Sequence, residues 1–182
     1  MPDAPLLASP RIPPLRASPR DQATDELLAL AGPFGNNNLF TTMVQHPRLF
    51  KHWVPWGTAM LYATMPGRDR ELLILRSAFR ARSHYEWGQH IRLAGRFDVR
   101  DEEIERIRVG ADAPGWSPHD ASLVRAVDEL IDDQMISNST WELLTQSYDE
   151  KLMMEVPLVV AHYYGLGLVL NSLGVQLDDD LG

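Results

Sequence analysis

The sequence predicts an all-α domain of about seven or eight helices, preceded by an extended proline-rich arm. Apolar residues recur at helical spacing in several segments. Glycine and proline mark the breaks between these segments. No alternating run of Val, Ile and Thr lies between hairpin turns, which argues against a sheet. We therefore expect an arm over residues 1–20 and one helical domain over residues 21–182.

The arm contains six of the 13 prolines of the chain. Proline fixes φ and removes a backbone donor, so this segment is expected to be extended and polyproline-like. Two alternatives stay open. The segment is either a disordered tail, or it lies along a surface, for example that of a neighbouring subunit, through its apolar residues Leu6, Leu7, Ile12 and Leu15.

Three helical segments follow the arm. The segment TDELLALAG predicts a helix with Thr24 as N-cap and an end at Gly32–Pro33. The segment NNLFTTMVQ runs to His46, and a third helix covers about Pro47 to Thr64. The sequence MPGRD then indicates a turn.

The next two helices form the middle of the chain. Between about Arg68 and Arg82, Leu72, Leu75 and neighbouring apolar residues share one helical face. The segment HYEWGQHIRLAGRF follows as a separate helix.

Four further segments complete the domain. DVRDEEIERIRVG begins with acids and ends at Gly110, as suits the helix dipole. SPHDASLVRAVDELIDDQ opens with Ser117, Pro118 and Asp120, a strong helix start. SNSTWELLTQSY begins a short helix. DEKLMMEVPLVVAHYYGLGLVLNSLG is a long apolar helix in which Pro157 is expected to cause a kink.

Composition limits the function classes. The net charge of −8 argues against nucleic acid as a partner, because such binding needs basic patches. No run approaches the ~20 apolar residues that span a bilayer, and the N-terminus lacks a signal-peptide pattern, so we expect a cytoplasmic protein without membrane contact. The absence of cysteine excludes disulfides, thiolate metal sites and thiol redox chemistry by this chain alone.

The stretch RSHYEWGQH concentrates reactive residue types. Ser83, Glu86 and His90 lie at positions i, i+3 and i+7, which share one helical face. An adjoining apolar stripe that includes Trp87 should pack inward. The polar face then lies beside the core, where burial shifts pKa values and a carboxylate and an imidazole can exchange a proton.

Known metal-binding, phosphate-binding and hydrolase motifs do not match this stretch. A zinc deaminase needs a later Pro-Cys-x-x-Cys, zincins need His-Glu-x-x-His, and di-iron bundles need two Glu-x-x-His pairs; none is present. No phosphate-binding or dinucleotide loop appears either. Ser83 and His90 are about 10 Å apart by helical rise, which disfavours a serine hydrolase. We therefore expect no metal site and no dinucleotide-binding site.

One long segment, RELLILRSAFRARSHYEWGQHIRLAGRFDVRDEEIERI, resembles the core motif of the carboxymuconolactone decarboxylase family, within the AhpD-like superfamily. The resemblance extends over most of residues 25–175 and implies an AhpD-like helical bundle. The peroxidase branch of the family has a glutamate, a Cys-x-x-Cys pair and a histidine at fixed spacing. Those positions hold Glu71, Ser83, Glu86 and His90 here, so both cysteines are replaced.

The replacement of the two cysteines changes the chemistry that the resemblance implies. A serine hydroxyl cannot act as a thiolate and forms no disulfide, so the peroxidase or peroxiredoxin activity of the family is not expected from this chain. The chain is similar instead to the cysteine-less decarboxylase branch, which needs no cofactor. Loss of CO₂ from a lactone acid leaves a carbanion or dienolate that must be stabilised and reprotonated. Histidine and glutamate suit the proton transfers, and a donor such as Tyr85 suits the oxyanion.

The proposed catalytic residues are His90 and Glu86, with Glu71 orienting them. Each also has a structural interpretation. His90 could be a helix histidine with satisfied hydrogen bonds, Glu86 could pair with Arg82 on the surface, and Glu71 could favour the dipole at a helix start.

The proposed substrate-binding residues are Tyr85, Ser83, Trp56 and Arg76. Tyr85 could instead serve packing, and Ser83 could be the N-cap of its helix. Trp56, with Trp53, walls either the cavity or a subunit contact. Arg76 could bind a substrate carboxylate in bidentate fashion or lie on the surface.

Two further expectations concern the long apolar helix and the assembly. His162 and Tyr163 lie on this helix, where buried polar groups must be hydrogen-bonded, so they belong to the core or support the site. The resemblance implies a homotrimer or a homohexamer.

The first functional hypothesis is a cofactor-free lyase that acts on a small carboxylated or lactone substrate of aromatic-ring catabolism. A non-catalytic oligomeric or ligand-binding protein is the first alternative, and a peroxidase partner that borrows thiols from another protein is the second. A lyase should have a cavity of a few hundred Å³ on which Glu71, Glu86 and His90 converge, with a perturbed carboxylate.

Overall fold

The computed structural model describes residues 7–15 and 19–178, and within these ranges it contains nine α-helices, two 3₁₀ segments and no strand. The all-α prediction is therefore confirmed. The α-helices, in chain order, are α1 (Gln22–Leu28), α2 (Asn38–Met43), α3 (Pro47–Leu61), α4 (Gly67–Arg80), α5 (His84–Ala94), α6 (Asp101–Val109), α7 (Pro118–Asp132), α8 (Asn138–Leu144) and α9 (Glu150–Leu173). The 3₁₀ segments are η1 (Ala29–Phe34) and η2 (Gly95–Phe97).

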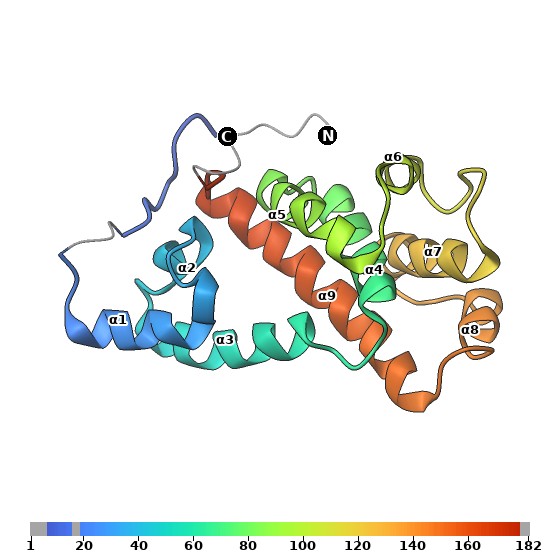
Figure 1. Ribbon diagram of the computed structural model, residues 1–182, viewed down its shortest axis with the longest axis horizontal. Helices are drawn as coiled ribbons and strands as arrows, with labels where there is room; N and C mark the ends of the chain where they lie inside the picture. Colours follow the sequence, from blue (N-terminus) through green and yellow to red (C-terminus); the bar gives the residue numbers. More distant parts are fainter. Residues whose placement is uncertain (1–6, 16–18, 179–182) are drawn as a thin grey trace.

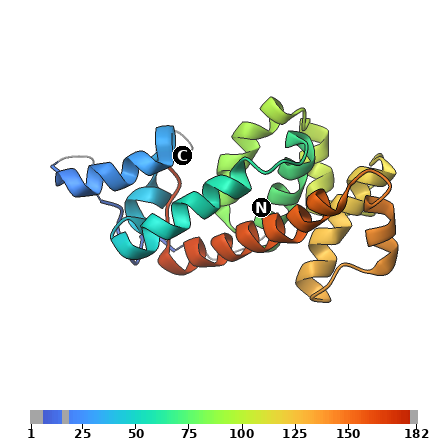
Figure 2. The same ribbon diagram turned by 90° about the horizontal axis from the view of Figure 1, so that it is seen from below.

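Helix α9 runs diagonally through the molecule and contacts α3, α4, α5 and α7 (Figure 1). The N-terminal helices α1 to α3 lie toward the C-terminal end of α9, whereas α7 and α8 lie toward its N-terminal end (Figure 2). Helices α4 and α5 pack against α9 and against each other. The proposed catalytic residues Glu71, Glu86 and His90 therefore lie on a helix pair that is held against the central helix.

Helix α4 is buried almost all round, because every residue from Asp69 to Ala78 is buried. Its apolar residues form the centre of the largest core cluster, and Leu72 and Leu75 are fully buried there. A charged side chain on such a helix needs a hydrogen-bonding or oppositely charged partner, because an unpaired buried charge is costly. Glu71 and Arg76 are both in this position.

Two expectations about the N-terminal region need correction or completion. Asp21, not Thr24, caps α1, because its side chain accepts a hydrogen bond from the Thr24 backbone N–H at 2.8 Å. The described part of the arm lies along this chain's own surface: the Arg11 N–H donates to the Leu173 carbonyl at 2.9 Å, and the Leu15 N–H donates to the Thr41 carbonyl at 3.1 Å. Residues 1–6 and 16–18 of the predicted arm lie outside the described residues.

Helix α9 is long and apolar enough, by length and composition, to cross a membrane, contrary to the expectation from the sequence. This is weak evidence for a membrane span, because the core helix of a folded bundle passes the same test. Here α9 is continuous through Pro157 and packs along α4. One set of its apolar residues, including Val156, Val159 and Val160, belongs to the core, whereas Met154, Leu158, Leu168 and Val169 are exposed.

Candidate functional site

The turn between α4 and α5 sets the position of the site. Ser83 is fully buried and is the N-cap of α5, where its side chain accepts from the Glu86 backbone N–H at 3.4 Å. Arg82 takes the left-handed conformation with φ 53°, which lets the chain reverse within three residues. The antiparallel pair that results brings Glu71 of α4 alongside α5.

Helix α9 holds this turn from the other side. The Asn171 side-chain amide donates to the Ala81 carbonyl at 2.8 Å. A Cβ atom at Gly167 would lie 2.7 Å from the Cβ of Ala81 and 3.1 Å from that of Ser83, so the close approach of α9 requires glycine. The turn therefore has little freedom, and neither has the first part of α5.

Three buried side chains meet behind this turn. The Nδ1 atom of His90 lies 2.9 Å from Oε1 of Glu71, within hydrogen-bond distance. The Nε2 atom of His90 lies 3.8 Å from Oε2 of Glu86. The exposed fractions of the three residues are only 1% for Glu71, 3% for Glu86 and 5% for His90. One imidazole is thus placed between two carboxylates away from bulk water.

The surroundings shift the pKa values of both groups that face each other across 3.8 Å. Burial raises the pKa of Glu86 to about 7; a charge on His90 opposes this shift and the Glu71 charge adds to it. Burial by itself lowers the pKa of His90, but the charge and the hydrogen bond of Glu71, helped by Glu86, outweigh burial and raise it. Near neutral pH, Glu86 can therefore give or take a proton, and the raised pKa of His90 shifts this group toward the imidazolium form.

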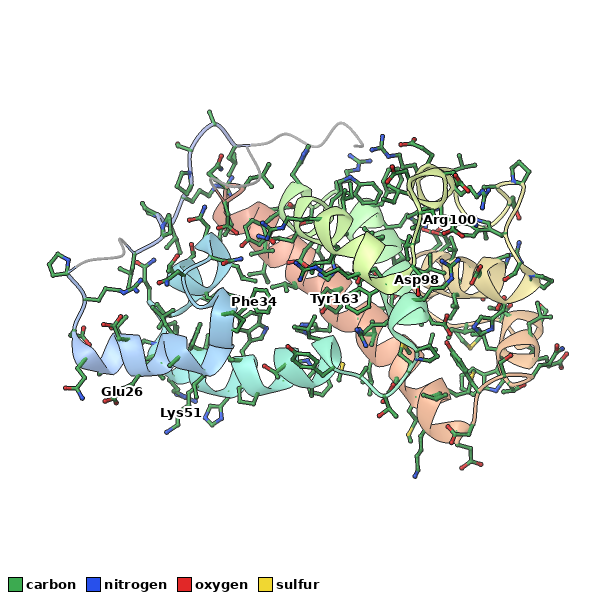
Figure 3. The ribbon with its side chains drawn as sticks, viewed as in Figure 1. Glu26, Phe34, Lys51, Asp98, Arg100 and Tyr163 are labelled. Atoms are coloured by element: carbon green, nitrogen blue, oxygen red, sulfur yellow. The ribbon has the colours of Figure 1, made fainter. Side chains whose placement is uncertain are left out.

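Glu86 and His90 line a cavity of about 260 Å³, whereas Glu71 lies behind His90 and does not line it. The walls come from η1, α2, α3, α5 and α9. Figure 3 labels two wall residues, Phe34 at the end of η1 and Tyr163 on α9. The Tyr163 ring stands edge-on to His90, with centroids 5.3 Å apart.

The carboxylate of Glu86 faces this cavity without a hydrogen bond from any side chain of residues 7–15 or 19–178, although its backbone N–H binds Ser83. It also forms no ion pair with Arg82, the alternative partner that the sequence offered. A buried carboxyl group without a hydrogen-bonding side chain is costly to maintain, and such groups concentrate at functional sites.

Two of the predicted substrate-binding residues, Tyr85 and Ser83, lie near the site, but only Tyr85 lines the cavity. Tyr85 lines the cavity, but its hydroxyl already donates to Asp178 at 2.8 Å and accepts from the Leu39 N–H at 3.4 Å. It is therefore a wall residue with an occupied hydroxyl. Ser83 does not line the cavity, and its hydroxyl caps α5.

The other two predicted substrate-binding residues lie elsewhere. Arg76 pairs in bidentate fashion with Asp128 at 2.8 and 2.9 Å and donates to the Ile107 carbonyl at 2.6 Å. It joins α4 to α7 and does not line the cavity. Trp56 is 44% exposed and also lies outside the lining; Trp53, one helical turn earlier, lines it instead. The packing of α3 therefore decides which of the two indoles lines the cavity: Trp53 is half-buried and Trp56 is exposed.

The position of Glu71 within its helix also differs from the expectation. Helix α4 begins at Gly67, so Glu71 lies beyond the first turn and its environment is set by His90 rather than by the helix start.

One residue of the cavity wall, His162, was expected from the sequence only as a core residue or as support for the site. His162 lines the cavity and stacks on Trp53, with ring centroids 6.4 Å apart. The position of His162 on an apolar helix indicated that the side chain is buried. The sequence could not show which helix or cavity it faces. Within the described residues no group of three or more His, Asp or Glu side chains is arranged to hold a metal ion.

Residues 47–129 match the model of the carboxymuconolactone decarboxylase family. The matched segment contains the whole of α4 and α5, and with them Glu71, Glu86 and His90. Among proteins of curated function, no significant match was found.

Solved structures show a similar fold. A peroxidase-related protein from Ralstonia eutropha, described as an alkylhydroperoxidase AhpD core, has a TM-score of 0.75 at 14% identity, over 93% of this chain and 94% of that chain. The debrominase Bmp8 has a TM-score of 0.70 at 14% identity, over 92% of each chain. A variant of that debrominase in complex with 2,3,4-tribromopyrrole has a TM-score of 0.68 at 14% identity, over 92% of this chain and 91% of that chain. At these identities the likeness concerns the fold alone, and it confirms the AhpD-like bundle.

Proposed function

We propose that this chain, whose residues 47–129 match the model of the carboxymuconolactone decarboxylase family, is a lyase that decarboxylates a small carboxylated or lactone substrate by proton transfer. One observation carries the proposal: Glu86 and His90 face the same cavity with 3.8 Å between their polar atoms, and Glu86 is buried without a hydrogen-bonding side chain in the described structure.

The reaction assigns a step to each group. The bond between the substrate carbon and its carboxylate breaks, CO₂ leaves, and the electron pair stays on the carbon, delocalised into a conjugated carbonyl. A proton from Glu86 then quenches this carbanion, and solvent returns the proton to Glu86 afterwards. A carboxyl group with a pKa of about 7 suits this task, because general acids work best when their pKa lies near the operating pH.

His90 serves the charged groups of the substrate in this scheme. None of the described residues that line the cavity is Lys or Arg, so a protonated His90 is the positive charge that they offer to a substrate carboxylate or a developing enolate. Glu71 keeps His90 oriented and protonated through its contact with Nδ1, which leaves Nε2 directed to the Glu86 side.

Thiol chemistry is not part of the proposal, because the chain contains no cysteine.

The test is a screen of small lactone acids and unsaturated ring acids for release of CO₂, with the product analysed after reaction in D₂O. We expect one solvent deuteron at the carbon that lost CO₂. Glu86→Gln and His90→Ala should each lower kcat by roughly 10²- to 10⁴-fold, the usual contribution of a general acid. Glu142→Gln and His52→Ala, at exposed positions, are the matched controls and should leave kcat unchanged.

Two results would contradict the proposal. Turnover that persists in both Glu86→Gln and His90→Ala would remove these residues from the chemistry. Binding of compounds without any turnover across the screen would favour the non-catalytic, ligand-binding alternative.

A further inference from the structure

We propose that the cavity takes a small ring compound with one hydrogen-bonding substituent besides the group that reacts, and that His162 on the α9 wall binds this substituent. The inference rests on the proposed function for the position of the reacting carbon, and it adds a substrate class and a binding residue.

The cavity walls favour a flat ring. Six aromatic side chains line the cavity together with leucines: Phe34, Phe40, Trp53, Tyr62, Tyr85 and Tyr163. Aromatic rings bind other rings through offset or edge contacts and contribute large apolar area. A cavity of about 260 Å³ holds one small ring with its substituents. The absence of Lys and Arg from the lining disfavours a substrate with several negative charges, which would have to give up hydration without compensation.

Three aromatic side chains hold the His162 ring in place. Trp53 stacks on it at 6.4 Å, and Trp56 meets it nearly perpendicularly, also at 6.4 Å. Tyr163 stands edge-on at 5.0 Å. The imidazole therefore keeps one orientation without the help of a hydrogen bond, which lowers the entropy cost of binding a ligand.

The polar atoms of His162 are free for a ligand, because no described residue forms a hydrogen bond with its ring. Burial lowers the pKa of His162 to about 4, so the ring is neutral near physiological pH, with one nitrogen as donor and the other as acceptor. A neutral imidazole matches a hydroxyl or a carbonyl group. At His90, in contrast, the charge of Glu71 raises the pKa and so favours the charged form, and Tyr163 contacts both imidazoles.

The test compares two probes of similar shape, phenol and toluene, in ligand-observed NMR titrations that need no turnover. In His162→Leu we expect phenol to bind roughly 3- to 10-fold more weakly, the value of one neutral hydrogen bond, and toluene to change by less than about twofold. His162→Gln, which keeps a hydrogen-bonding group, should retain most of the phenol affinity. His52→Leu is the control on the exposed side of α3.

Three outcomes would overturn the inference: no binding of phenol to the wild-type protein, an equal loss of both probes in His162→Leu, or no loss of phenol. His162→Met replaces the leucine variant if that protein does not fold. Because binding is measured without chemistry, these outcomes are separate from the Glu86→Gln and His90→Ala activities, which test the lyase itself.

Discussion

Replacement of Glu86 by glutamine should make the protein more stable at alkaline pH while it removes the proposed acid. The pKa of about 7, against an ordinary value of 4.5, means that the folded protein holds this proton more tightly than the unfolded chain does. The folded state therefore binds more protons between pH 4.5 and about 7, and wild-type stability falls as the pH rises through that window.

The difference in pKa corresponds to about 3 kcal/mol of stability lost once Glu86 is ionised. Because Glu86 is buried, solvent screening does not reduce this value much. The neutral amide of Glu86→Gln avoids the cost of a buried charge. At about pH 8 we expect the variant to be more stable by about 3 kcal/mol, which for a chain of this size raises Tm by roughly 6–12 °C.

The assay is thermal unfolding followed by circular dichroism at about pH 4 and about pH 8, with Glu142→Gln as control because its side chain is exposed. The gain should vanish at the lower pH, where the wild-type carboxyl group is protonated in both states. Equal stabilities of Glu86→Gln and wild type at the higher pH would refute the claim that this carboxylate is buried at a cost.

Two further predictions concern the residues behind the site. Glu71→Gln should lower the pKa of His90, because it removes the charge that outweighs burial; an NMR titration of the histidine resonances checks this, and an unchanged His90 curve would contradict the assigned pairing. Arg76→Leu should destabilise the fold by roughly 1–3 kcal/mol, because it removes two charge-assisted hydrogen bonds to Asp128 and one to the Ile107 carbonyl, while Arg80 still pairs with Asp128. Chemical denaturation measures this loss, Arg48→Leu at an exposed position is its control, and an undisturbed stability would return Arg76 to the substrate-binding hypothesis.

The structure bears out those features of the sequence that depend on local physics. Helix starts at Ser83 and Ser117 follow from side chains that cap backbone N–H groups, and the structure has both caps. Spacing alone placed Glu86 and His90 on one face of a helix. Thr24 was the exception, because Asp21, three residues earlier, accepts a hydrogen bond from the Thr24 backbone N–H and the helix begins at Gln22.

Contacts between side chains of different helices could not be predicted from these local sequence signals. Trp56 and Trp53 both lie in the same helix, and only the packing of α3 decides which indole faces the cavity. Arg76 looked available for a substrate because Asp128, its partner, is 52 residues away in the sequence.

The sequence by itself determined the helical class, the loss of thiol chemistry and the pairing of a carboxylate with an imidazole on α5, because periodicity, capping and composition act over a few residues. Only the tertiary structure decided that Glu71 contacts His90, that the buried Glu86 carboxyl group lines the cavity, and that His162 lines the same cavity. These contacts depend on how α4, α5 and α9 pack together, and the burial that this packing produces is what shifts the pKa values on which the proposed chemistry depends.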